Sequence, residues 1–396
     1  MPSPISLKRK TILFNNVGAD LYGADYVLLC LVRSLDPSCF RIIVIVPCDG
    51  PLVPELRKSG AKVIIRELPV LRRGVFTPFG LIQFAWQSVT SVFFLAALAG
   101  AAKVDIFHTN TASLWTPGLV ATIKSKPHIW QVMELVEKPQ LVRWAMSKMT
   151  SIFSTRVYCI SDAVRRHFLK GNSRYAAKFK TLYHGVDRAE YDPDASGDPT
   201  IREGLRISDN GIVILYAGRF SEWKGQDVMA AAVKLLCHRG LARRFDMHFI
   251  FLGSCFPGYE QCQVDLAAAL GQLTEPTRVH MKGFQRNLPD WIRASDIFVL
   301  PSKRPEPNAT VLIAAMTMGL PCIGTNIGGT VETIDQGETG LLVPPNDPEA
   351  IANAIAALAS DPSLRESMGR KGRIRARELF SIGNYCCTIT AAYDAV

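Results

Sequence analysis

Residues 212–225 read IVILYAGRFSEWKG, an apolar run that leads into a loop with two basic residues. The run Ile212–Ala217 is rich in β-branched residues, which predicts a strand buried on both faces. The segment Gly218–Gly225 then joins this strand to a helix predicted over Gln226–His238. A buried strand that passes through a short loop into a helix is the repeating unit of a parallel sheet covered by helices.

The same alternation continues in both directions along the chain. The predicted strands are Thr11–Phe14, Ile42–Val46, Val63–Ile65, Ile106–His108, Ile129–Val132 and Arg156–Ile160 in the first half, and Ile212–Ala217, Met247–Leu252, Arg278–Lys282, Ile297–Pro301, Cys322–Thr325 and Gly340–Val343 in the second. Between the two series, Tyr191–Gly197 reads YDPDASG, which is typical of a turn-rich linker. We therefore predict an α/β protein of two Rossmann-like, doubly wound domains that face a cleft, over residues 1–190 and 191–380. Residues 381–396 are expected to form a C-terminal helix that returns toward the first domain.

The composition is that of a globular protein, with 48% hydrophobic and 20% charged residues among 396. The ten cysteines lack the spacing of metal ligands, which favours a reducing, cytoplasmic compartment. The longest apolar stretch, Val92–Ala102, is shorter than the roughly 20 residues of a membrane-spanning helix.

The net charge of +10 belongs to the first half of the chain, where residues 1–190 carry a balance of +13. Such a charge attracts anionic partners, for example an acidic membrane surface, a lipid diphosphate, an acidic polysaccharide or nucleic acid. The alternative is a soluble basic domain that binds nothing through its charge.

The helix predicted over Leu81–Ala102 has almost no charged face. Such a helix can pack into the core of the first domain, or it can lie in the interface of a membrane with help from Arg72 and Arg73. The second alternative predicts a peripheral protein at the inner face of the membrane.

The loop Gly218–Gly225 carries the strongest local signal for chemistry. Arg219 can engage two phosphate oxygens with its planar fork, and Lys224 supplies a mobile positive charge, so together they suit a diphosphate. The alternative interpretation is two exposed basic residues on a loop.

A second loop, Pro301–Thr310, also connects a strand end to a helix, which is predicted over Ala309–Met318. The first N–H groups of such a helix can bind phosphate without any side chain. Glu306 is placed to accept hydrogen bonds from sugar hydroxyls, although it can also be a surface carboxylate between two prolines.

Two further strand-to-helix turns contain glycines. Gly324–Thr330 has a glycine pair that allows positive φ or a close backbone approach. In the first half, Asn15–Asp25 reads NNVGADLYGAD and could offer amides to a phosphate, but it is not a GxGxxG pattern, which disfavours a nicotinamide cofactor.

Taken together, these segments resemble the retaining glycosyltransferases of family four, which have the GT-B fold. The resemblance covers nearly the whole chain in order, and the matching segments are LYGAD (21–25), LYHGVD (182–187), GRFSEWKGQDV (218–228) and PSKRPEPNATVLIAAMTMGLPCIGTNIGG (301–329). The resemblance implies transfer of a sugar from a UDP- or GDP-sugar to a glycan or lipid-linked acceptor, with retention and without a metal or other cofactor. It implies no nucleic-acid partner.

The resemblance also implies roles for individual residues. Arg219, Lys224 and Glu306 would be the catalytic residues, the two cations on the diphosphate and the carboxylate on the sugar. The remaining donor-binding residues would be Gly18, Gly23, Gln131, Gly218, Gly283, Phe284, Asn308, Ala309, Thr310 and Ala314. Departure of a nucleoside diphosphate builds negative charge, which two cations and a helix N-terminus can stabilise where other transferases use Mg²⁺.

Two departures from the family pattern support an alternative function. The family usually has a second glutamate eight positions after the first, where this chain has Ala314, and often a histidine where this chain has Gln131. A degenerate, non-catalytic protein that binds a nucleotide or glycan for a partner enzyme is therefore the second hypothesis, and nucleotide-sugar epimerisation is a third. The one DxD pattern, Asp192-Pro193-Asp194, is interpreted as a turn and not a metal site.

Overall fold

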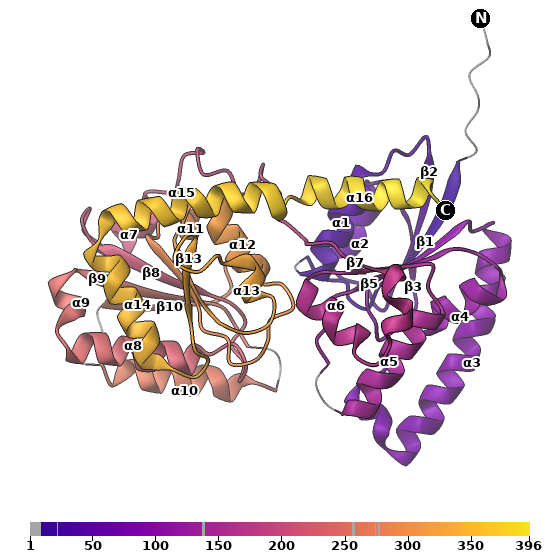
Figure 1. Cartoon of the computed structure of the whole chain (residues 1–396), viewed down its shortest axis with the longest axis horizontal. Coiled ribbons are helices and arrows are strands. Elements are labelled where there is room, and N and C mark those ends of the chain that lie inside the picture. Colours follow the sequence, from indigo (N-terminus) through magenta and orange to yellow (C-terminus); the bar gives the residue numbers. More distant parts are fainter. Residues whose placement is uncertain (1–8, 22, 137–138, 256–257, 274, 276–277) are drawn as a thin grey trace, which may run out of the picture. The chain divides into compact units, whose positions relative to one another are not determined.

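The apolar runs of the sequence form two parallel β-sheets, one in each of two units of the chain (Figure 1). The computed structural model describes residues 9–396, except for 22, 137–138, 256–257, 274 and 276–277. The first unit comprises the described part of Met1–Tyr183 with Ile382–Val396, and the second comprises His184–Ser381. The chain thus passes between the units a few residues before the predicted boundary at 190.

The first sheet has the strand order β3-β2-β1-β4-β5-β6-β7, with all neighbours parallel. Its strands are β1 (Lys10–Asn15), β2 (Phe40–Val46), β3 (Lys62–Ile65), β4 (Ile106–Thr109), β5 (His128–Val132), β6 (Arg156–Cys159) and β7 (Phe179–Thr181). This order reverses direction between β1 and β4, as in doubly wound nucleotide-binding folds. The short edge strand β7 was not predicted, because it has no apolar run.

Helices cover both faces of the first sheet because alternate strand residues point to opposite sides. Ile12 and Phe14 pack toward one set of helices, and Leu13 packs toward the other. The first set is α1 (Ala24–Ser34), α2 (Leu52–Lys58) and α16 (Ile382–Asp394), and the second is α3 (Pro78–Ala101), α4 (Thr116–Ile123), α5 (Gln140–Ile152) and α6 (Asp162–Leu169). Short 3-10 turns occupy Arg73–Phe76 and Ser173–Lys178.

The C-terminal helix α16 belongs to the first unit although it is the last element of the chain. Ile389 and Tyr393 are fully buried in the same cluster as β1, β2 and α1. The Tyr393 hydroxyl also contacts His108 Nδ1 at 2.6 Å. His108 is therefore a core histidine, and its burial lowers its pKa to about 3.

The second sheet repeats the same winding with the order β10-β9-β8-β11-β12-β13. Its strands are β8 (Ile212–Ala217), β9 (Met247–Leu252), β10 (Val279–Lys282), β11 (Ile297–Leu300), β12 (Cys322–Thr325) and β13 (Gly340–Val343). Its helices are α7 (Thr200–Gly204), α8 (Gln226–His238), α9 (Leu241–Arg244), α10 (Glu260–Gly271), α11 (Leu288–Arg293), α12 (Thr310–Thr317), α13 (Thr330–Thr333), α14 (Pro348–Ser360) and α15 (Pro362–Leu379). One large apolar cluster buries Ile214 and Phe249 against α8, α10 and α14. The predicted strands of this half agree with the structure to within one residue at each end.

The linker contains the turn that the DxD pattern predicted. The Asp194 N–H donates to Asp192 Oδ1 at 3.0 Å, and the Asp194 carboxylate pairs with Arg373 at 2.7 Å. Both aspartates therefore serve the local structure of the linker and its attachment to α15.

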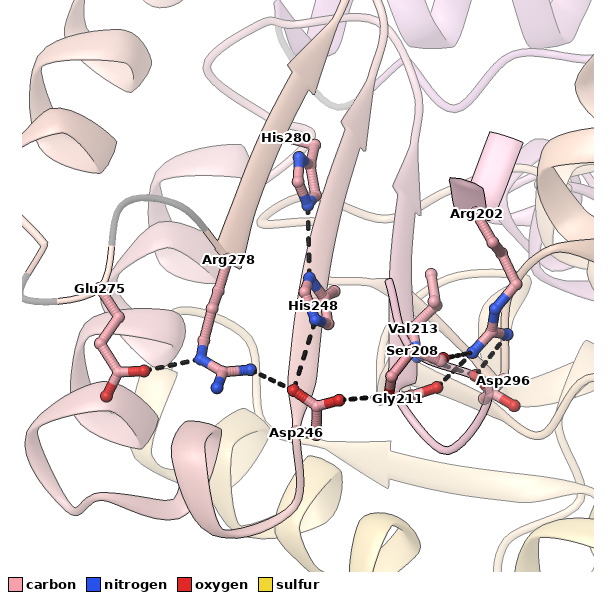
Figure 2. A network of polar contacts seen from close by, with 10 residues as sticks. All are labelled: Arg202, Ser208, Gly211, Val213, Asp246, His248, Glu275, Arg278, His280 and Asp296. Atoms are coloured by element: carbon pink, nitrogen blue, oxygen red, sulfur yellow. Dashed lines mark hydrogen bonds and ion pairs between the residues drawn. The ribbon is translucent and has the colours of Figure 1, made fainter. Parts of the chain in front are cut away.

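The amino ends of the second sheet are held by a chain of polar contacts (Figure 2). Asp246 accepts hydrogen bonds from Ser208 and from Arg278, each at 2.6 Å, and Arg278 also pairs with Glu275 at 2.7 Å. Asp296, directly before β11, accepts a hydrogen bond from the Val213 N–H at 2.8 Å. These contacts tie together the segments that precede β8, β9, β10 and β11.

Candidate functional site

Three loops follow neighbouring strands at the carboxyl ends of the second sheet. They leave β8, β11 and β12, which are adjacent in the sheet, and span 218–225, 301–309 and 326–329. The chain runs toward β9 after β8 but toward β12 after β11, so the first two loops flank a topological switch point. Folds of this kind bind their ligands at that point.

Gly225 holds the first two loops together. Its φ is +71°, and a Cβ atom there would lie 1.8 Å from the Pro301 carbonyl oxygen, so the position requires glycine for both reasons. Beside it, the Lys303 N–H donates to the Trp223 carbonyl oxygen at 2.7 Å. Lys303 Nζ also pairs with Asp227 at 2.8 Å. These contacts fix the lysine-bearing loop against the loop that carries Glu306.

Glu306 lies at the centre of the three loops. Lys224 Nζ donates to both carboxylate oxygens, at 2.8 and 2.9 Å, and Ser302 Oγ donates to one of them at 2.6 Å. The Glu306 side chain is only 8% exposed, and a carboxylate is buried to this degree only with such partners. Lys224 and Glu306 were predicted for separate roles, and the structure shows that they contact each other.

Ser302 is a site residue that the sequence did not single out. Its carbonyl oxygen accepts a hydrogen bond from Thr325 Oγ1 at 2.8 Å, which links the second loop to the end of β12. The sequence could have indicated this residue, because Ser302 has a small hydroxyl side chain, follows a buried strand and lies four positions before Glu306.

The third loop contacts Glu306 through its glycine pair. Gly328 has a φ of +61°, and a Cβ atom there would lie 2.6 Å from the Glu306 carbonyl oxygen. The Gly329 N–H donates to that same oxygen at 2.6 Å. This is the close backbone approach that the two glycines predicted.

Four buried polar atoms around these loops have no hydrogen-bond partner among the described residues. They are the Tyr216 hydroxyl, Ser221 Oγ, Asn308 Nδ2 and Thr330 Oγ1. Leaving such a group unpaired costs about 1–3 kcal/mol, so native proteins rarely tolerate it without a reason. Burial and then the charge of Glu306 raise the pKa of Tyr216, so its hydroxyl keeps its proton and can donate. All four belong to the three loops or to the strand and helix residues that flank them, which makes these segments the candidate place for a polar ligand.

Helix α12 points its N-terminus at the same loops. It begins at Thr310 after Ala309, one residue later than predicted, and no side chain caps it. The first N–H groups of a helix have no partner within the helix, and they carry a partial positive charge. The start of α12 can therefore bind an anion.

The other predicted residues of this unit lie in different surroundings. Arg219 is half-buried on the first loop next to Gly218, and it makes contacts within the protein. Gly283 and Phe284 are exposed after the edge strand β10, which β9 separates from β8. Ala314 is fully buried on the second turn of α12 and has no polar group to offer.

The glycines predicted in the first unit surround a carboxylate. Asp25 accepts hydrogen bonds from Asn16 Nδ2 at 2.7 Å and from the Asp20 N–H at 2.9 Å. A Cβ atom on Gly18 would lie 2.2 Å from this carboxylate, and Gly23, with a φ of +59°, precedes α1. Burial raises the pKa of Asp25. The loop therefore uses the Asp20 amide on its own carboxylate, and the donor-binding roles of Gly18 and Gly23 stay predictions.

Gln131 is buried and attaches the C-terminal helix. Its Oε1 accepts a hydrogen bond from the Tyr385 hydroxyl of α16 at 2.7 Å, and its side chain is almost inaccessible to solvent. Gln131 therefore has a structural contact with α16, and its role at the donor stays a prediction.

Glu134, three residues after Gln131, lies at the carboxyl end of the first sheet. Its carboxylate accepts from Thr111 Oγ1 and from the Ala112 N–H at 3.2 Å, and burial raises its pKa. This residue received no role from the sequence. Among the described residues, no group of three His, Cys, Asp or Glu side chains is arranged to hold a metal ion.

Two family models match the chain and together cover most of it. The model described as Glycosyl transferases group 1 matches residues 197–375, and the model described as Glycosyltransferase Family 4 matches residues 22–190. The first match contains all three loops around Glu306.

Individual glycosyltransferases and other proteins are similar to this chain over most of its length. The D-inositol 3-phosphate glycosyltransferase 1 of Catenulispora acidiphila is 32% identical over 368 residues, 87% of this chain and 84% of that protein. The spore coat protein SA of Bacillus subtilis is 25% identical over 302 residues, 74% of this chain and 78% of that protein. Alignments with several other curated relatives cover less than half of those proteins' length. Among solved structures, Anabaena HepE in complex with UDP and glucose superposes with a TM-score of 0.80 at 20% identity, over 97% of this chain and 99% of that chain, which shows the shared fold.

Proposed function

The chain belongs to the glycosyl transferases group 1, the retaining GT-B glycosyltransferases of family four, and from this premise we propose that its second unit binds a UDP- or GDP-sugar and transfers the sugar to a glycan or a lipid-linked acceptor. One observation carries the assignment of the donor site. Lys224, Glu306 and the uncapped start of α12 lie on the connections that follow the neighbouring strands β8 and β11, and Lys224 and Glu306 form an ion pair.

The diphosphate is assigned to Arg219, Lys224 and the first amides of α12. An ammonium group has three N–H donors, and the two oxygens of Glu306 accept two of them. One donor of Lys224 is left for a phosphate oxygen, while the guanidinium of Arg219 adds a second positive charge. These groups stabilise the charge that develops on the leaving diphosphate without any metal ion.

Glu306 is assigned to the sugar, and its contacts suit that role. Lys224 and Ser302 hold its carboxylate in one orientation, in which its oxygens can also accept hydrogen bonds from hydroxyl groups. Asn308 Nδ2, on the same loop, is a buried donor without a partner among the described residues, and a sugar or phosphate oxygen can satisfy it. Ala314 offers no such group, so the ribose must be held by other residues.

The acceptor is assigned to the first unit. Asn15, Asn16 and Asn110 lie at or directly after the carboxyl ends of β1 and β4, and no Lys or Arg lies between Thr11 and Asp25. Neutral amides bind hydroxyl groups and do not neutralise a diphosphate. Retention without a protein nucleophile then requires that the leaving phosphate oxygen receives the proton of the acceptor hydroxyl on the same face of the sugar. We place this reaction in a reducing, cytoplasmic compartment, since none of the ten cysteines forms a disulfide and two of them, Cys48 and Cys387, are exposed.

A thermal-shift experiment tests the donor site. Purified protein is melted with UDP, GDP and the corresponding sugars, because a ligand that binds the native state stabilises it by about 2.7 kcal/mol at 100 times its Kd. Arg219→Ala should lose the shift with the nucleoside diphosphate. Glu306→Gln should keep that shift but lose the further gain from the sugar.

Arg304→Ala is the matched control, because Arg304 is an exposed cation on the Glu306 loop. It should behave as the wild type. Equal shifts in all three variants would reject the assignment, and so would the absence of any shift with every common donor.

A further inference from the structure

Helix α3 exposes a row of large apolar side chains on its outward face. It spans Pro78–Ala101 without a single Asp, Glu, Lys or Arg. Its outward residues recur every three or four positions and are large and apolar: Phe79, Ile82, Trp86, Val89 and Phe93. Of these, Phe79, Trp86 and Phe93 are 77%, 70% and 73% exposed. Surface helices normally place polar residues there.

In the middle of α3, the face that packs on the protein carries hydroxyl side chains. Ser88 and Ser91 are buried, and Ser91 Oγ lies 3.2 Å from Thr116 Oγ1 of α4. Leu95 and Ala99, further along the same face, pack into the core with Val120 of α4. The helix is thus anchored along the sheet by one side and presents a continuous apolar stripe on the other.

This anchoring distinguishes α3 from a membrane span. By length and composition α3 is the described helix that could cross a membrane. A spanning helix would have to leave the core cluster that buries Leu95 and Ala99. A helix held on the surface of a domain can instead lie in the plane of the membrane interface with its apolar face inserted.

Helix α5 adds a second stripe on the same side of the sheet. Both helices cover the face that carries Phe107 and Trp130, and Figure 1 shows them on the opposite side from α16. On α5, Leu141, Trp144 and Ile152 are exposed, one or two turns apart.

The surrounding charge is basic. Residues 66–152, which contain α3, α4 and α5, carry nine Lys or Arg against four Asp or Glu. Arg143 and Lys148 lie on α5 itself, and the Arg66 guanidinium lies 4.0 Å from the ring centre of Phe94 on α3. Exposed Trp and Phe flanked by cations are the combination that binds the headgroup region of an anionic bilayer.

We propose that the outer faces of α3 and α5 dock this protein on the surface of a membrane that contains anionic phospholipid. The apolar stripe enters the interface, and the cations remain at the headgroups. The site is separate from the donor loops and does not depend on the proposed sugar transfer. It would hold the first unit at the surface where a lipid-linked acceptor is found.

Vesicle flotation tests the proposal with the full-length protein. Vesicles of phosphatidylcholine with phosphatidylglycerol should carry the protein upward, and vesicles of phosphatidylcholine alone should carry much less. The triple variant Ile82→Gln, Trp86→Gln, Phe93→Gln should partition about 100-fold more weakly, which corresponds to about 2.7 kcal/mol. Arg143→Glu with Lys148→Glu should lower binding to the anionic vesicles by about tenfold or more.

The control variant is Val264→Gln with Ile374→Gln, which removes exposed apolar side chains from the second unit. It should float as the wild type does. The thermal shift with UDP or GDP should be the same in all these variants, so a failure of docking is distinguishable from a failure of the donor site.

Tryptophan quenching by brominated phospholipid locates the inserted face. The chain has six tryptophans, and Trp86 and Trp144 lie on the two stripes. The variant Trp86→Phe with Trp144→Phe should still bind vesicles but lose the quenching. Quenching that persists in this variant, or a wild type that does not float, would overturn the proposal. So would a wild-type dimer in sedimentation that the triple variant turns into a monomer, because the face would then join two copies of the chain.

Discussion

The two ends of the second sheet use charged residues differently. At the amino ends, Asp246, Arg278, Glu275 and Ser208 satisfy one another in a closed chain of contacts (Figure 2). At the carboxyl ends, the pair of Lys224 and Glu306 is accompanied by four buried polar atoms without a partner among the described residues.

The difference shows how one sheet separates stability from binding. Polar groups that hydrogen-bond to each other stabilise the folded protein without a ligand. Buried polar groups without a partner cost free energy until a ligand pairs with them, so they favour the ligand-bound state. Substitutions at the amino ends should therefore change folding without changing catalysis, and substitutions of the polar groups at the carboxyl ends should change catalysis.

The largest effect is expected from Arg219→Ala with Lys224→Ala. Because both cations are assigned to the charge that develops on the leaving diphosphate, turnover should fall by about 10³-fold or more. The protein should still unfold cooperatively, although the loss of Lys224 leaves the buried Glu306 carboxylate without its cation and therefore lowers the free energy of unfolding. Steady-state kinetics with the donor found by thermal shift measure the first quantity and denaturant unfolding the second. Full activity in this variant would remove the distinction between the two ends.

Gly225→Ala should connect the two properties. Positive φ and the approach to the Pro301 carbonyl oxygen make alanine unfavourable here, and we expect a loss of about 3 kcal/mol in the free energy of unfolding, together with lost activity. Gly240→Ala is the matched control, since Gly240 has a φ of +68° but no atom within 4 Å of the added Cβ. It should cost only about 1 kcal/mol. Equal losses would show that the first two loops are not packed as closely as the structure places them.

Much of the fold could be predicted from the sequence because buried parallel strands are marked by continuous apolar runs. The runs Ile212–Ala217 and Met247–Leu252 are strands with the same bounds in the structure. By contrast, β7 was missed because Phe179–Thr181 is short and lies at an edge.

The site was only partly predictable because its contacts join distant residues. The loops of Lys224 and Glu306 were identified, but the ion pair between residues 82 positions apart could not be. Gln131 was assigned to the donor because of its place in the family pattern, and its bond to Tyr385 spans 254 positions. For α3, the lack of charged residues removed the signal that tells the outer face of a helix from the inner one.

A smaller effect is expected from Asp246→Asn, at the closed end of the sheet. Asp246 has a φ of +46°, which asparagine tolerates, so the substitution removes the charge without adding backbone strain. Loss of the charged contacts with Ser208 and Arg278 should cost about 1–2 kcal/mol in denaturant unfolding. Hydrogen bonds from Ser208 and Arg278 lower the pKa of Asp246, so this contribution is present above the unfolded pKa and is lost as the pH falls through the lower folded pKa. The value of kcat/KM should not change, and a tenfold loss would contradict the separation of the two ends.

The smallest effect is expected from His280→Gln. His280 Nε2 lies 3.4 Å from His248 Nδ1 with the rings nearly parallel, and burial together with the charge of His248 lowers the pKa of His280 to about 4. As the pH falls from about 6.5 toward 4, the unfolded chain takes up a proton that the folded protein does not, so stability is lost over that range. Because His280 is partly exposed, its share between pH 7 and pH 5 should be about 1 kcal/mol, and the variant should lack it in urea unfolding at the two pH values. His238→Gln, at the exposed end of α8, should keep the full pH dependence. If His280→Gln keeps the same pH dependence of the free energy of unfolding, His280 accepts a proton in the folded protein. The comparison between the two ends of the sheet would then be wrong.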